Sequence, residues 1–160
     1  MNDRDAHSQV VRWVETMTGI NTIKAYQSGP APTTPYNMVN MLGSRDIRAH
    51  EQVIEFADQG PDVKASPVIE VEWSFSVHAY GSNPTDNLRG IRSAAKLSQV
   101  MEPMLPSLIV HEVSQIRHVP DWINNQWQPR AQLDLFVRGL TRDGFLLDVI
   151  EQTEINIERV

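Results

Sequence analysis

Three residues in one short segment have the types that acid–base or metal chemistry requires: Glu70, Glu72 and His78. They alternate with apolar residues, so a β-strand would place all three on one face, where side chains two residues apart can converge. Carboxylate and imidazole groups held together can bind a metal ion or transfer a proton. The same spacing is typical of the solvated face of an amphipathic strand, and we adopt that interpretation.

The spacing of Ser93 and Lys96 matches the S-x-x-K pattern of penicillin-binding enzymes, and residues three apart do meet on a helix. The partner motifs of those enzymes are missing, so the pattern indicates a helix face of small residues. The chain also contains no phosphate loop, no G-x-G-x-x-G fingerprint and no G-x-S-x-G elbow. We therefore predict no catalytic residues, no metal site and no cofactor, and a chain that is not an enzyme.

The composition is that of an ordinary folded protein of 160 residues, which we expect to form one domain over residues 1–160. Cysteine is absent, which excludes disulfides and cysteine zinc sites and fits a reducing cytoplasm. A formal net charge of −6, from 14 basic and 20 acidic residues, argues against tight nucleic-acid binding. No apolar run approaches the roughly 18 residues of a membrane helix, and the polar N-terminus does not resemble a signal peptide.

One segment is unusual because it places Trp122 and Trp127 in what the composition predicts to be an irregular loop. Tryptophan is costly to leave in water, so such a loop either caps the core or contacts a partner. His118 lies in the same loop and is either a polar contact at an interface or a plain surface histidine. Directly after the loop, Arg130 and Asp134 share one strand face, where they form either an exposed ion pair or a contact with a neighbouring subunit.

Two helices are predicted from the spacing of apolar residues, over residues 8–18 and 84–101. The N-terminal cap of the first helix is Ser8 or Asp5, since both are good capping residues. The second helix begins after Asn83, where a cap residue is followed by proline, and it ends before two further prolines. The chain therefore begins with a helix and carries a second helix between predicted strands.

Alternation of apolar and polar residues predicts strands, most clearly over 69–80 and 131–138. Further strands are expected over 36–42, 47–56, 108–116 and 147–159. Polar stretches containing proline predict loops over 26–35 and 57–67. Long alternating strands beside separate helices indicate an α+β fold: an antiparallel (mixed) β-sheet of about five to six strands packed against two helices.

Three patches of the chain share the order and spacing of motifs of one known family. The patches are Gln27, Pro32 and Pro35-Tyr36; Ala79-Tyr80-Gly81 followed by Asn83 to Arg92; and Asn124, Trp127, Pro129 to Gln132, Asp134 and Val137. Together they resemble the neck or tail terminator proteins of long-tailed bacteriophages and prophages. The resemblance covers most of the chain, and the last patch is its most specific part.

The resemblance implies a structural protein of the virion neck without catalytic residues. Such a protein forms a ring, usually a hexamer, that closes the tail tube at its final length and then docks onto the head–tail connector. The implied partners are tail tube, sheath and connector proteins, with no membrane, and the implied place of assembly is the cytoplasm of the bacterial host. An acidic ring would repel DNA phosphates, so that a genome can pass through it without sticking.

The loops 57–67 and 117–129 are the expected contacts with tube and connector, and an edge strand is the expected joint between subunits. The candidate interface residues are Asp62, Lys64, His118, Trp122, Trp127, Arg130 and Asp134. Three alternatives remain open: a head-completion or stopper protein nearer the capsid, a small metal-dependent hydrolase that uses the face of Glu72, and a monomeric binding module with a tryptophan-lined site.

Overall fold

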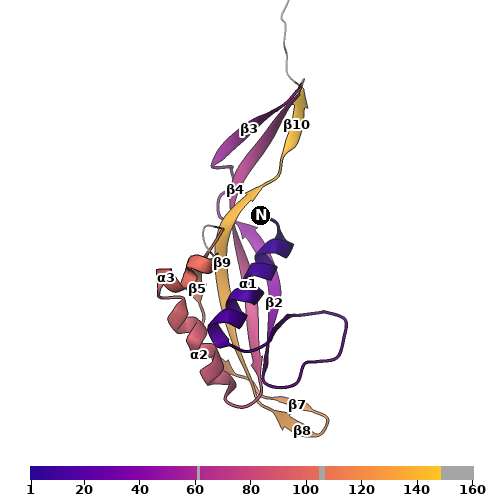
Figure 1. Ribbon diagram of the computed structural model, residues 1–160, viewed down its shortest axis with the longest axis vertical. Coiled ribbons are helices and arrows are strands. Elements are labelled where there is room, and N and C mark those ends of the chain that lie inside the picture. Colours follow the sequence, from indigo (N-terminus) through magenta and orange to yellow (C-terminus); the bar gives the residue numbers. More distant parts are fainter. Residues whose placement is uncertain (61, 105–106, 149–160) are drawn as a thin grey trace, which may run out of the picture.

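The computed structural model describes residues 1–60, 62–104 and 107–148 (Figure 1). A long mixed sheet runs through an elongated molecule, and helices pack against its lower half in this view. The α+β fold with an N-terminal helix and a second helix between strands is confirmed. The main sheet contains more strands than expected within the described residues, because segments predicted as loops pair with it.

Helix α1 covers Asp3–Thr18 and therefore begins five residues before the predicted start. Neither predicted residue caps it: the side chain of Asn2 accepts a hydrogen bond of 2.8 Å from the backbone N–H of Asp5. The helix ends at Gly19, whose φ of 65° is readily available to glycine. Its apolar stripe points into the protein and comprises Ala6, Val10, Trp13 and Val14.

The strands are β1 (Thr22–Lys24), β2 (Tyr36–Asp46), β3 (Val53–Gln59), β4 (Asp62–Tyr80), β5 (Leu108–Val113), β6 (Arg117–His118), β7 (Asp121–Ile123), β8 (Gln126–Gln128), β9 (Arg130–Arg142) and β10 (Phe145–Asp148). The central order is β1-β2-β4-β9-β5, while β3 and β10 pair with β4 and β6 pairs with β9. Strands β1 and β2 are parallel, and the other pairs are antiparallel. Strands β7 and β8 form a separate hairpin.

Strand β4 connects the two halves of the molecule. Its 19 residues span roughly 60 Å at the usual rise of about 3.3 Å per residue. Its second half lies between β2 and β9, whereas residues 62–68 pair with β3, and of these residues 62–65 also pair with β10. We call the ribbon of β3, residues 62–68 and β10 the arm; it projects beyond α1 at the top of Figure 1.

The second predicted helix is shorter than expected. Helix α2 covers Pro84–Ala94, and a short helix α3 (Ser98–Met101) and a 3-10 turn η1 (Glu102–Met104) follow it. The two helices are separate because Leu97 is extended, with φ −116° and ψ 107°. Asn83 is the residue before α2, but its side chain makes no capping hydrogen bond.

The core lies where α1 and α2 cover the sheet. The alternation predicted for 69–80 and 131–138 is confirmed, because the apolar residues of β4 and β9 face this core. The largest fully buried side chains are Trp73, Phe75, Leu88, Ile91, Leu108, Leu133 and Leu135. Gly139 is needed on β9, since a Cβ there would meet the carbonyl oxygen of Ser107 at 2.7 Å and the ring of Trp73 at 3.1 Å.

Three predicted segments differ from the structure. The predicted loop 57–67 belongs almost entirely to strands β3 and β4, because residues 57–59 and 62–67 pair across the two strands. The predicted strand 47–56 begins only at Val53, and residues 47–52 form bends. Of the predicted last strand 147–159, residues 147 and 148 belong to β10, and the rest lies outside the described residues.

Candidate assembly surfaces

The structure divides the seven predicted interface residues between the two ends of the molecule. Asp62 and Lys64 lie on β4 in the arm, not in a loop. His118, Trp122 and Trp127 lie on β6, β7 and β8, near the opposite end in Figure 1. Arg130 and Asp134 lie on β9 beside that end. The seven residues therefore mark two separate candidate surfaces.

The predicted irregular loop before Arg130 is an ordered β7–β8 hairpin. Trp122 and Trp127 face each other across it, with ring centroids 5.1 Å apart in an edge-on arrangement. The turn residues Asn124 and Asn125 have φ values of 51° and 59°, a left-handed conformation that asparagine tolerates. Trp122 is 57% exposed and Trp127 67%, so the pair does not cap the core and instead forms an apolar patch on the surface. We call this element the tryptophan hairpin.

Two ion pairs attach this region to the sheet. Arg130 pairs with Asp121, the first residue of β7, and Arg117 pairs with Asp134 at 2.6 Å. The observed partners of Arg130 and Asp134 thus lie in the same chain, and they hold the base of the tryptophan hairpin against β9. His118 is exposed and lies in register with Ala131.

The arm carries apolar side chains that sequence analysis missed. Residues directly opposite each other in antiparallel strands share a face, and here Phe56 and Phe145 flank Ala65. Further along the same face, Ile54 lies opposite Pro67 and Leu147 opposite Val63. The exposed fractions of the large members are 66% for Phe56, 61% for Phe145, 48% for Leu147 and 41% for Ile54. We call this surface the apolar arm face. Its signal in the sequence is the spacing of Ile54 and Phe56, which are two positions apart and therefore lie on the same face of a strand.

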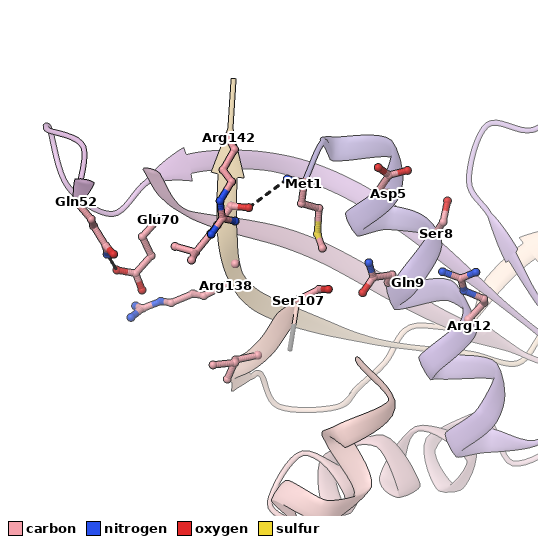
Figure 2. Close-up of a pocket in the computed structure, with 13 residues that line it drawn as sticks. Met1, Asp5, Ser8, Gln9, Arg12, Gln52, Glu70, Ser107, Arg138 and Arg142 are labelled. Carbon is pink, nitrogen blue, oxygen red and sulfur yellow. Dashed lines mark hydrogen bonds between the residues drawn. The ribbon is translucent and has the colours of Figure 1, made fainter. Parts of the chain in front are cut away.

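An open groove of about 950 Å³ lies at the base of the arm (Figure 2). One wall is α1, which contributes Asp5, Ser8, Gln9 and Arg12. The opposite wall comes from the last residues of β9, from β5 and from the segment around Gln52, whose amide donates a 3.1 Å hydrogen bond to Glu70. The full lining is Met1, Asp5, Ser8, Gln9, Arg12, Gln52, Glu70, Ser107, Ile109, Arg138, Gly139, Leu140 and Arg142.

The face of Glu72 is not the solvated surface that the sequence predicts. Glu72 is only 4% exposed, and its carboxylate accepts hydrogen bonds of 2.6 Å from Arg45 and 2.9 Å from Arg138. Burial raises the pKa of Glu72, but hydrogen bonds from Arg138 and Arg45 outweigh burial and hold that pKa below its usual value. Burial lowers the pKa of His78. Among the residues that the structure describes, no three His, Asp or Glu side chains form a cluster that could hold a metal ion.

An elongated α+β body with exposed apolar surfaces on projecting elements at both ends is typical of a protein that assembles with partners. The model of the phage neck terminator protein family matches residues 5–160, nearly the whole chain. The chain therefore belongs to the phage neck terminator family, as the motifs around Trp127 indicate. None of the curated proteins matches the chain. In the described part of the chain, no helix is long and apolar enough to span a membrane.

Proposed function

We propose that this chain forms a ring that closes the phage tail tube and joins it to the head–tail connector. By analogy with terminator proteins in general, the ring has six copies. The observation that carries the proposal is the family match over residues 5–160. The elongated shape supports it, because the tryptophan hairpin and the arm present two separate exposed apolar surfaces at opposite ends. A protein of the neck must hold different neighbours in this way, and the same chain must contact copies of itself.

Passage of DNA through the ring follows from the same proposal. The chain carries a formal net charge of −6, and we propose that an acidic face of each copy lines the lumen of the ring. Such a lumen repels phosphate groups and disfavours the release of counterions that drives tight binding to DNA. The genome would therefore pass without specific contacts, and the partners that bind the ring are proteins.

Mass photometry of the purified protein, alone and with isolated tail tubes, tests this function first. The expected result is a ring-sized species, or a cap at one end of each tube. The free chain is expected to form rings more readily on tubes than in solution, because assembly must not precede completion of the tube. A chain that stays monomeric and ignores tubes would contradict the proposal.

The tryptophan hairpin is our assignment for the contact with the tail tube. Replacing Trp122 and Trp127 together by serine is expected to weaken tube binding at least about thirtyfold, since exposed tryptophans at interface centres typically contribute about 2 kcal/mol or more. The free energy of unfolding is expected to fall by no more than about 1.5 kcal/mol, because both side chains are exposed and only their mutual contact is lost. Titration of labelled tubes and urea denaturation measure the two effects.

Leu97 supplies the matched control for this experiment. Its side chain is 57% exposed, the same fraction as Trp122, but it lies between α2 and α3, away from the hairpin. Leu97→Ser is expected to leave tube binding unchanged. Equal losses in the control and in the tryptophan variant would show a general surface effect, and unchanged binding in the tryptophan variant would remove the hairpin from the tube contact.

A further inference from the structure

The apolar arm face is a continuation of the sheet face that the helices cover. Along β4, the core residues Trp73 and Val71 and the arm residue Ala65 are all an even number of positions apart, so they lie on one face. Helix α1 covers this face only as far as its own first turn, where Asp3 accepts a 2.7 Å hydrogen bond from the indole N–H of Trp73. Beyond that level the same face continues without a helix, and its large side chains are exposed.

We propose that the apolar arm face of one copy lies in the groove beside α1 of the next copy. This inference rests on the proposed ring function and names the surfaces that join its subunits. Arm and groove are different surfaces of the same chain, so their contact is heterologous, and repetition of a heterologous contact closes a ring when the rotation fits. Each subunit is then inclined so that its arm overlies the body of its neighbour.

The dimensions of the two surfaces match. Strand β3 has seven residues, which span about 23 Å at about 3.3 Å per residue. Helix α1 has 16 residues and is about 24 Å long at about 1.5 Å per residue. A second, smaller groove shares Gln9 and Arg12 with the first and extends along α1 to Met104, so the acceptor surface follows the helix for much of its length.

The charges of the two surfaces also match. Asp58 lies opposite Val63, so it shares the apolar arm face and is exposed near the tip of the arm. Arg12 is exposed in the groove and forms no ion pair with any residue in the described part of the chain. Of the three arginines that line the groove, Arg138 and Arg142 already pair with Glu72 and Glu55, which leaves Arg12 as the cation that can meet the arm. Asp58 at the tip of the arm and Arg12 on α1 therefore favour this orientation of the arm over its reverse.

Apolar contacts in the groove are available for the arm. Ile109 on β5 is 55% exposed and lines the groove together with Met1 and Leu140. These side chains and the aliphatic stem of Arg12 can cover Phe56 and Phe145 of the neighbouring copy. A second copy therefore fits this face in shape, polarity and charge. Asp62 and Lys64 alternate along β4 with the residues of the apolar arm face, so they lie on its opposite side and outside this contact.

A charge exchange tests the pairing of the two surfaces. Asp58→Arg and Arg12→Asp are each expected to reduce the fraction of rings on tail tubes at least about tenfold, because each places like charges together. In the double variant every interface contains the same two positions with their charges exchanged. The fraction of rings on tail tubes is therefore expected to return to within about threefold of the wild type. If the double variant is as defective as the two single variants, or if neither single change matters, the proposed contact is wrong.

A mixing experiment tests whether the contact is heterologous. The arm variant Phe56→Ser with Phe145→Ser keeps an intact groove, and the groove variant Arg12→Asp keeps an intact arm. Each alone is expected to form rings at least about tenfold less than the wild type, and an equal mixture is expected to form mainly pairs of one copy of each. An arm-to-arm contact would instead leave the groove variant fully able to assemble, which would overturn the proposal. Circular dichroism and urea denaturation of each variant establish that it folds.

Because the chain has no cysteine, single cysteines can be introduced without background. Ile54→Cys with Gln9→Cys, treated with a short bismaleimide on tail tubes, is expected to give a ladder of covalent oligomers whose highest band is the number of copies in the ring. Ile54→Cys with Tyr26→Cys is the control, since Tyr26 is 94% exposed but lies outside the groove. If the wild-type chain forms rings but the Ile54→Cys with Gln9→Cys variant gives no ladder, the arm contact is wrong and the ring function stands. If the wild-type chain never caps tubes, the ring function and this inference are both wrong.

Discussion

Replacing Trp73 by alanine is expected to lower the free energy of unfolding by about 3–5 kcal/mol. Trp73 is fully buried in the middle of β4, and its indole N–H donates a 2.7 Å hydrogen bond to Asp3. The substitution therefore leaves a large cavity under α1 and removes the contact that holds the start of that helix on the sheet. Since many domains have only about 5–15 kcal/mol of stability, this change takes a large part of it.

Urea denaturation followed by circular dichroism measures the effect of the Trp73 variant, and Trp127→Ala is its matched control. The control removes the same side chain at a site that is 67% exposed, so the unfolding free energy is expected to change by no more than about 1 kcal/mol. When equal amounts of folded protein are compared, Trp127→Ala is expected to weaken tube binding more than Trp73→Ala does. Similar losses of stability in the two variants would mean that Trp73 does not organise the core as the structure indicates.

The part of the fold that the sequence predicts best is the strand with uninterrupted alternation of apolar and polar residues. Residues 69–80 alternate without interruption, and the apolar positions from Val71 to Ala79 are buried under the helices. The alternation does not predict that Glu72 and Ser76 on the other face are buried as well. Period-two alternation is a local signal that depends only on one face being covered. The start of α1 was less predictable. Its N-terminal cap is the side chain of Asn2, which precedes the residues 8–18 whose apolar spacing predicts the helix.

The arm could not be predicted from composition because its apolar face is assembled from distant segments. Residues 57–67 contain a glycine, prolines and charges, which are typical of a loop. Their strand conformation depends on pairing with β3 and with β10, and the latter is about eighty residues further along the chain. Local propensity gives way to such tertiary pairing in strands more readily than in helices.

For the tryptophan hairpin, the sequence does contain a local signal for the turn. Two tryptophans flank Asn124-Asn125, and asparagine in both central positions is compatible with the primed turns that join two strands. The ion pair of Arg130 with Asp121 is not predictable in the same way. It exists only because the hairpin returns the chain to the start of β9, so that Asp121 and Arg130 meet across nine positions.

An ion-pair cluster with a buried carboxylate links three strands of the body, and neutralising its centre is expected to be costly. Glu72 accepts hydrogen bonds from Arg45 on β2 and from Arg138 on β9, so three neighbouring strands meet at one carboxylate. Glu72→Gln keeps the shape but removes the charge, and it is expected to lower the unfolding free energy by about 1.5–3 kcal/mol at pH 7. The lower part of this range is favoured because Arg45 is 71% exposed and can be solvated.

A matched control separates this effect from ordinary surface electrostatics. Glu55 contacts Arg142 at 3.0 Å, but the two side chains are 49% and 45% exposed. Glu55→Gln is therefore expected to change the unfolding free energy by less than about 1 kcal/mol, and high salt is expected to remove most of that change. The same denaturation series on both variants decides whether burial gives Glu72 its larger role.

The stability that Glu72 contributes is expected to depend on pH, and the direction follows from its shifted pKa. The pKa of Glu72 is lower in the folded chain than its ordinary value of 4.5, so the unfolded chain binds more protons at acidic pH. The stability that Glu72 contributes is therefore fully present above about pH 5 and is lost as pH falls through the folded pKa. The difference between wild type and Glu72→Gln is expected to shrink over that acidic range, whereas a difference that stayed constant down to about pH 3 would contradict an ionised, arginine-paired Glu72.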